Sequence, residues 1–258
     1  MVELVDLSGV VEEGQPVYPG NTRTQFFVTN THEESGHAWA QELDGDTGAV
    51  ERKLRAKRAG DDEEHALVRT LVVSEHGPTH VDAFSHLDPT EDASIDEIPL
   101  DRFYTPAVAL DLTHVTDEEF IGVDDLEAAL DGAGLELREG DAVLLDTGHY
   151  AATYDADDHE LRYAYLHSYT GLTADAAEWL ADAGVSNIGI DAPSIDHASA
   201  MRTKEYPAHD VCADHRMLNM ENMANIDRVA GERFTLCAFP LKLKGGTGSP
   251  IRPVAILH

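Results

Sequence analysis

Three short apolar runs constrain the fold of this 258-residue chain more than any other feature. They are AVALDL at 107–112, AVLLDTG at 142–148 and VSNIGID at 185–191, and each has the length and composition of a buried β-strand. Helical patterns lie between these runs. One covers Val123–Leu130, and the other covers Thr173–Ala183, which begins at a threonine suited to capping a helix and ends before a glycine. The alternation of buried strands with helices predicts the α/β fold class.

Strand patterns also occupy both ends of the chain. VELVDL at 2–7 alternates apolar and polar residues, ALVRTLVVSE covers 66–75, and RFTLCAFPLKL at 233–243 is followed by a closing strand at 252–257. Strands outnumber helices, and the two alternate only in part. We therefore expect a mixed central β-sheet flanked by helices, in an α/β or α+β arrangement.

The domain organisation is predicted from the positions of glycines, prolines and polar stretches along the chain. The 20 glycines and 11 prolines are spread along it, and the sequence contains no repeat and no low-complexity linker. This pattern predicts one domain over residues 1–258. Residues 32–64 are polar, charged and weakly periodic, which predicts an insertion in that domain with a short helix near 50–58.

The chain is strongly acidic. It has 49 Asp and Glu residues against 18 Lys and Arg residues, which gives a formal net charge of −31. Binding nucleic-acid phosphates needs a basic surface, so this charge excludes a nucleic-acid reader. Like charges at this density repel each other in dilute buffer, and concentrated salt screens the repulsion, which is typical of salt-adapted (halophilic) proteins. Most carboxylates are therefore expected on the solvated surface.

The cellular location is predicted from three features. No apolar run approaches the roughly 20 residues that span a bilayer, so no membrane association is expected. The first residues, MVELVDLSGVVEEG, lack the basic and then apolar pattern of a secretory signal. The two cysteines, Cys212 and Cys237, are too few for a disulfide framework or a cysteine zinc site. Together these features predict a cytoplasmic protein.

One segment, SEHGPTHVDAFSH, contains a cluster of residues that can bind metal or transfer protons. It places His76, His80, Asp82 and His86 at offsets 0, 4, 6 and 10, with Gly77-Pro78 excluding a helix. In an extended chain, even offsets point to one face. A straight strand would separate the outer histidines by about 33 Å, so the Gly-Pro turn must fold His76 back towards His80 and Asp82. Two imidazoles and a carboxylate that converge in this way are ligands for zinc or manganese.

Other candidate motifs are weaker. An isolated histidine is more often hydrogen-bonded in a core than a ligand, and only the clustering reverses that expectation. GGTGS at 245–249 lacks the ending of a phosphate loop and is predicted to be a tight turn, and the sequence has no G-x-S-x-G elbow. The two cysteines are more typical of core thiols than of nucleophiles. His149 and His215 could line a pocket, with surface or core placement as the default.

The segment HGPTHVDAFSH resembles the signature of the metal-dependent hydrolases of the cyclase family, which includes bacterial kynurenine formamidase and isatin hydrolase. Further segments match that family in the same order: DLSGVVEEGQPVYPGN, AVLLDTG, VSNIGIDAPSID, HRMLNMENMANID and FPLKLKGGTGSPIRPVAIL. The resemblance covers most of the chain outside residues 32–64. It implies the family's swivelling β/β/α fold, with a mixed sheet or barrel-like core.

The resemblance also implies a ligand set. His76, His80 and Asp82 match the first metal ligands of the family, and His209 and Glu221, twelve residues apart, match the remaining two. In the family Asp82 would be shared between two divalent ions, Zn²⁺ or Mn²⁺. Taken alone, the residues leave His209 and Glu221 open, because they could equally form a surface pair.

The remaining positions concern proton transfer and substrate. His86 matches the histidine that the family uses as proton donor and acceptor, and Tyr18 stands where kynurenine formamidases carry a substrate-lining tryptophan. Pro78 replaces a glycine of the signature and Phe84 replaces a proline. We expect metal binding to survive these departures, whereas the identity of the substrate does not carry over.

The function implied is hydrolysis of a carbon–nitrogen amide bond, either an N-formyl amide or a cyclic amide. Metal-activated water would attack the carbonyl, with His86 as general acid and base. The alternatives are a metal-binding protein without catalysis and a metal-dependent enzyme acting on another cyclic substrate, such as a lactone. The partners expected are a small-molecule amide and further copies of the chain, in a homodimer or homotetramer.

Overall fold

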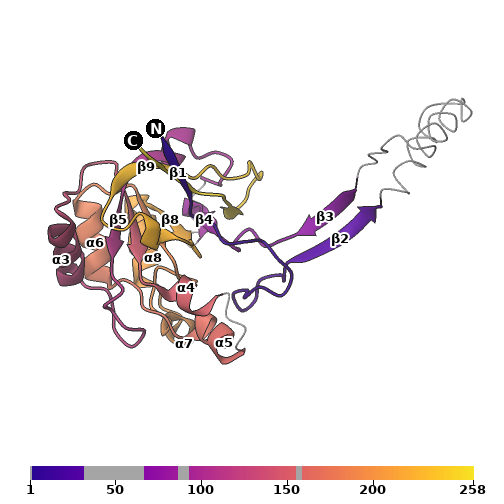
Figure 1. Cartoon of the computed structure of the whole chain (residues 1–258), viewed down its shortest axis with the longest axis horizontal. Coiled ribbons are helices and arrows are strands. Elements are labelled where there is room, and N and C mark those ends of the chain that lie inside the picture. The colour runs from indigo at the N-terminus through magenta and orange to yellow at the C-terminus, as the bar shows by residue number, and fades with distance from the viewer. Residues whose placement is uncertain (1, 32–66, 87–92, 155–158) are drawn as a thin grey trace, which may run out of the picture. The chain divides into compact units, whose positions relative to one another are not determined.

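The computed structural model describes residues 2–31, 67–86, 93–154 and 159–258 (Figure 1). The chain divides into two compact units, one made of Met1–Thr22 with Ser74–His258 and the other of Arg23–Val73. The predicted insertion at 32–64, with its helix near 50–58, lies outside the described residues, and one domain over 1–258 stays a prediction. No helix in the described ranges combines the length and the apolar character needed to cross a membrane.

The larger unit is built on a mixed nine-stranded sheet. Within the described residues its strands are β1 (Glu3–Asp6), β4 (His80–Asp82), β5 (Tyr104–Asp111), β6 (Ala142–Asp146), β7 (Asn187–Ile190), β8 (Leu218–Glu221), β9 (Arg233–Cys237), β10 (Gly248–Pro250) and β11 (Val254–Leu257). Their order is β1-β11-β9-β5-β6-β7-β8-β4-β10. The pairs from β5 to β8 are parallel, and all the others are antiparallel. The predicted α/β class with a mixed sheet is confirmed.

Helices connect these strands. They are α3 (Val123–Ala133), α4 (His149–Thr153), α5 (His159–His167), α6 (Ala174–Asp182), α7 (Ala200–Thr203) and α8 (Pro207–His215), with 3₁₀ turns η1 (Phe84–His86), η2 (Leu100–Phe103) and η3 (Ile226–Arg228). Both predicted helices are present. The Thr173 hydroxyl caps α6 by accepting a hydrogen bond from the Ala176 backbone N–H at 3.1 Å. α3 ends at Gly134, whose φ of 66° suits a glycine.

Alternate side chains of β5 pack into two different core clusters, one on each face of the sheet. Val108 and Leu110 pack in one core cluster with residues of α3, α6 and α8. Figure 1 shows α3 and α6 beside β5. Ala107 and Ala109 point to the other cluster, where the side chains come mainly from the remaining strands and turns. Burial of one large aliphatic side chain stabilises the fold by about 1.5–3 kcal/mol. Buried side chains therefore stabilise the sheet on both faces. Within the sheet, β4 pairs directly with β8.

The smaller unit contains a hairpin that the sequence predicted only in part. β3 (Val68–Val72) lies in the strand predicted at 66–75, but it pairs antiparallel with β2 (Gln25–Asn30) in a separate two-stranded sheet. No strand was predicted at 25–30, because its residues are mostly exposed and leave no burial pattern. The strand predicted at 233–243 was also too long. β9 ends at Cys237, shortly before Pro240, which cannot donate to a ladder.

Candidate metal centre

The site is built on two neighbouring antiparallel strands. His80 of β4 lies directly opposite Glu221 of β8, and its Nε2 is 3.4 Å from Glu221 Oε2. Asp82 is two residues further along β4, so its side chain shares the face of His80, and its Oδ1 is 3.3 Å from His80 Nε2. The three side chains are nearly inaccessible to solvent. The even spacing read from the sequence therefore does place both β4 groups on one side.

His76 reaches the same carboxylate from the preceding turn. Its Nδ1 lies 2.6 Å from Asp82 Oδ1, which confirms that the Gly77-Pro78 turn folds it back. Its Nε2 contacts the Thr247 hydroxyl at 2.9 Å. The neighbouring Gly248 leaves room for the ring, because a Cβ there would lie only 2.7 Å from the imidazole.

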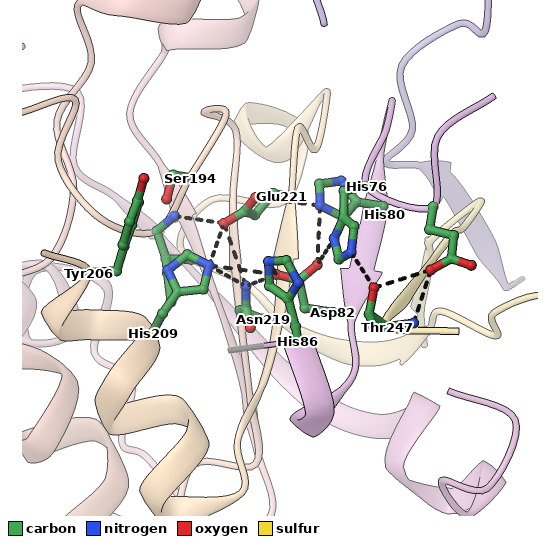
Figure 2. Close-up of polar contacts among 12 residues, drawn as sticks. His76, His80, Asp82, His86, Ser194, Tyr206, His209, Asn219, Glu221 and Thr247 are labelled. Carbon is green, nitrogen blue, oxygen red and sulfur yellow. Dashed lines mark hydrogen bonds and ion pairs between the residues drawn. The ribbon is translucent and has the colours of Figure 1, made fainter. Parts of the chain in front are cut away.

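The other side of Asp82 faces His209, near the start of α8. His209 Nε2 is 3.6 Å from Asp82 Oδ2 and 3.2 Å from Glu221 Oε1 (Figure 2). Asn219 also faces this cluster and donates to Asp82 Oδ2 at 2.7 Å. His209 and Glu221 are thus brought to the cluster from the sequence positions that the resemblance implied, rather than forming a surface pair.

Two overlapping groups of donors result. One consists of His76, His80 and Asp82, the other of Asp82, His209 and Glu221, and within each group the donor atoms lie within 4.8 Å of one another. Imidazole nitrogens and carboxylate oxygens are the donors that divalent zinc and manganese take in proteins. The donor set fits such ions, and Asp82 is the one member common to both groups.

Charge in this site is strongly coupled. Burial disfavours the charged form of His80, but the hydrogen bonds that its ring donates to Asp82 and Glu221 overcome this effect and raise its pKa to about 10. Burial likewise disfavours the charge of Glu221, yet its bonds to His209 and His80 lower its pKa to about 2. The pKa of Asp82 is held well below its usual range despite burial, with His86 the largest opposing influence. The carboxylates are thus ionised and attract positive charge.

His86 stands beside the donors without belonging to either group. It ends η1, its Nε2 is 3.9 Å from Asp82 Oδ2, and its ring lies 4.0 Å from that of His76 between centroids. Its side chain is 31% exposed, whereas that of His80 is 3% exposed. Burial lowers the pKa of His86, against the attraction of Asp82. A neutral, partly accessible imidazole at this position can exchange a proton with a bound molecule.

Two tyrosines lie near His209. The half-buried hydroxyls of Tyr18 and Tyr206 are 3.3 Å apart, and the ring of Tyr206 stands edge-on to His209 with centroids 6.1 Å apart. Burial raises the pKa of Tyr18, so its hydroxyl keeps its hydrogen near neutral pH. Tyr18 therefore lies next to the predicted site.

The other candidate residues do not belong to the two donor groups. His215 forms an exposed pair with Glu178, 2.9 Å from Nε2 to Oε2. His149 stacks on Tyr165 and contacts its carbonyl at 2.9 Å. Cys212 adjoins a hollow beside His86 and His209, and burial raises the pKa of its thiol to about 12, so it is no nucleophile. Cys212 and Cys237 form no disulfide.

Sequence reasoning missed the residues around the ligands. Asn219, Thr247 and Asp196 contact the donors, and Tyr206 lies beside them, but none was singled out. Asn219 could have been found, because it lies two residues before Glu221 in a strand and shares its face. Thr247 lies 171 residues from its partner His76, and no local pattern signals that pairing.

This chain is similar in sequence to known proteins. The model of the Cyclase family, described as "Putative cyclase", matches residues 5–197. A curated kynurenine formamidase of Salinibacter ruber is 30% identical over 254 residues, which cover 97% of this chain and 96% of that protein. A curated isatin hydrolase of Roseibium aggregatum is 29% identical over 199 residues, covering 72% of this chain and 73% of that protein.

Solved structures share the fold. The structure of isatin hydrolase A from Ralstonia solanacearum superimposes with a TM-score of 0.78 at 23% identity, covering 100% of this chain and 92% of that one. Isatin hydrolase A from Labrenzia aggregata, bound to benzyl benzoate, gives a TM-score of 0.77 at 23% identity and covers 99% of this chain and 94% of that one. At this level of identity the likeness establishes the architecture.

Proposed function

The chain belongs to the Cyclase family, and we propose that it is a metal-dependent amidohydrolase that cleaves the carbon–nitrogen bond of an N-formyl amide or a cyclic amide. The observation that carries this proposal is the pair of buried donor groups that share Asp82, with His86 beside them and outside both. A structural site needs its ligands alone, whereas an additional accessible imidazole suits proton transfer.

The proposed ligands divide between two ions. His76, His80 and Asp82 would hold one ion, and Asp82, His209 and Glu221 would hold the other. Zn²⁺ and Mn²⁺ both suit a site of imidazoles and carboxylates. When bound, such ions supply an activated water at neutral pH and polarise the carbonyl.

His86 is the proposed proton carrier. Its neutral imidazole accepts a proton as water adds to the carbonyl and returns it to the nitrogen as the carbon–nitrogen bond breaks. The amine is then released from an N-formyl amide, or stays on the opened ring of a cyclic amide. Asp82, 3.9 Å from Nε2, stabilises the protonated ring in between. Tyr18 is the proposed substrate contact, because its protonated hydroxyl lies beside Tyr206 and can donate to a polar group of the amide.

The proposed assembly is a homodimer or homotetramer. Apolar side chains of the hairpin are exposed on β2 and β3, among them Phe27, Val28 and Leu71 at 51%, 58% and 46%. A two-stranded hairpin is marginally stable in isolation. The sequence between these strands includes ERKLRAKR at 51–58, with five basic residues in a chain of net charge −31. A second copy of the chain would bury the exposed apolar side chains of β2 and β3, and its acidic surface would attract the basic residues at 51–58.

The proposed setting is the cytoplasm of a salt-adapted cell. The two cysteines remain free thiols, as in a reducing compartment. A net charge of −31 over 258 residues suits a medium in which salt screens self-repulsion. Assays of this protein therefore belong in molar KCl.

Turnover of chosen substrates tests the proposal. An N-formyl aromatic amine, isatin and an aryl lactone are offered to the protein in molar KCl with Zn²⁺ or Mn²⁺. We expect hydrolysis of at least one amide, and its loss together with bound metal in His80→Ala. His114→Ala is the control, since its exposed ring pairs only with Asp125 among the described contacts. Lactone cleavage without amide cleavage, or full metal without any turnover, would overturn the proposal.

A further inference from the structure

The buried carboxylate of Asp196 contacts the Nδ1 side of the His209 ring, which faces away from the donor group. Asp196 is 1% exposed, and its Oδ2 lies 2.5 Å from His209 Nδ1. The other ring nitrogen, Nε2, faces Glu221 at 3.2 Å and Asp82 at 3.6 Å. The imidazole therefore connects Asp196 on one edge with the donor group on the other.

The same carboxylate is fixed by the first turn of α8. Its Oδ1 accepts the Ala208 backbone N–H at 2.8 Å, and its Oδ2 accepts that of His209 at 3.3 Å. Pro207, at the start of the helix, has no N–H, and Tyr206 makes no side-chain cap. Asp196 thus caps α8 from a distant loop, and the positive helix end favours its charge. Hydrogen bonds therefore join the Asp196 carboxylate to both the start of α8 and the His209 ring.

This contact decides which nitrogen of His209 is free. A carboxylate accepts hydrogen bonds and donates none, so Nδ1 must carry the hydrogen. Nε2 is then the nitrogen that can release its proton and bind an ion. We propose that Asp196 is a positioning residue that fixes His209 with hydrogen on Nδ1 and aims Nε2 at the ion held with Asp82 and Glu221. The inference rests on the proposed metal site and deepens it.

The other two histidine ligands are held differently. His80 Nδ1 lies 2.9 Å from the Pro78 carbonyl, and His76 Nε2 lies 2.9 Å from the Thr247 hydroxyl. Both of these outer partners are neutral. Removal of the charge of Asp196 should therefore weaken one donor group and leave the other intact.

Metal titration of Asp196→Asn tests the proposal. Zn²⁺ is titrated calorimetrically into metal-free wild type and variant in molar KCl. We expect one class of site to weaken by about 10–100-fold, the usual effect of losing such an outer partner, and the other to be unchanged. Asp141→Asn is the matched control, because Asp141 is 0% exposed and pairs with Arg233 at 2.8 Å. It should lower Tm and leave zinc affinity unchanged. Wild-type affinity at both sites of Asp196→Asn would overturn the proposal.

A second measurement needs no folded variant of Asp196. In ¹⁵N-histidine-labelled wild type loaded with Zn²⁺, the NMR signals of His209, assigned by comparison with His209→Ala, should show hydrogen on Nδ1 and none on Nε2. A bare Nδ1 would refute the inference. Two variants distinguish failure of the proposed function from failure of this inference. Full zinc content in His209→Ala would refute the metal site itself. Loss of zinc in His209→Ala, with normal zinc binding in Asp196→Asn, would refute only the role of Asp196.

Discussion

Replacement of His86 by alanine separates proton transfer from metal binding. The ring lies outside both donor groups, so its removal should leave metal content near that of the wild type. A positioned general acid–base group contributes about 10²–10⁴-fold to rate, which corresponds to about 2.7–5.4 kcal/mol in the barrier. The loss should appear in kcat more than in KM, because proton transfer stabilises the transition state rather than the bound substrate.

The structural cost of His86→Ala is expected to be smaller. The side chain is 31% exposed, and its ring contact with His76 is worth at most about 1.5 kcal/mol. For a chain of this size, a loss of about 1.5 kcal/mol lowers Tm by about 3–6 °C. Metal content, Tm and kcat are measured on one preparation, with His114→Ala as the control. Loss of metal would make His86 a ligand, and unchanged kcat in the folded fraction would make it a packing residue. Either result would refute the assignment of His86 as the proton carrier.

Four further predictions follow from single features. Asp82→Asn should remove metal from both donor groups, and elemental analysis showing full metal content would contradict the shared role. Burial, together with the charge of Asp191, raises the pKa of Asp146 to about 7. The stability that the protonated Asp146 carboxyl contributes is therefore fully present below about pH 4 and is lost as pH rises through 7. Asp146→Asn should therefore raise Tm at pH 8 more than at pH 5, and equal shifts would count against it. Thermal melts should show Tm rising from dilute buffer to molar KCl, since the net charge is −31; a Tm independent of KCl would refute the halophilic interpretation. Thr173→Ala should cost about 1 kcal/mol in denaturant unfolding through loss of the α6 cap, and an unchanged midpoint would contradict that role.

The parts of the site that could be predicted are those with a local pattern. Even spacing put His80 and Asp82 on one face of β4, and the Gly-Pro turn required His76 to fold back; both expectations agree with the contacts. The buried strands at the centre of the sheet were predicted for the same reason, since their two-sided burial leaves continuous apolar runs.

The parts that could not be predicted depend on pairing over long distances. His209 and Glu221 came from family resemblance, because neither carries a local signal. Asp196 and Thr247 contact histidine ligands that lie 13 and 171 residues away in the chain, and no local pattern marks either contact. The β2 strand was missed for the opposite reason: its side chains are mostly exposed, so no periodic burial marks it.

Metal-dependent hydrolysis is tested most directly by relating bound metal to turnover. The protein is purified in molar KCl, stripped with a chelator, and reloaded with increasing Zn²⁺ or Mn²⁺ while bound metal per chain and hydrolysis of the N-formyl aromatic amine and isatin are measured together. We expect no turnover in the stripped protein and recovery that follows bound metal up to two ions per chain. Amide hydrolysis that persists at full rate without metal, or two bound ions with no hydrolysis of either amide, would contradict it.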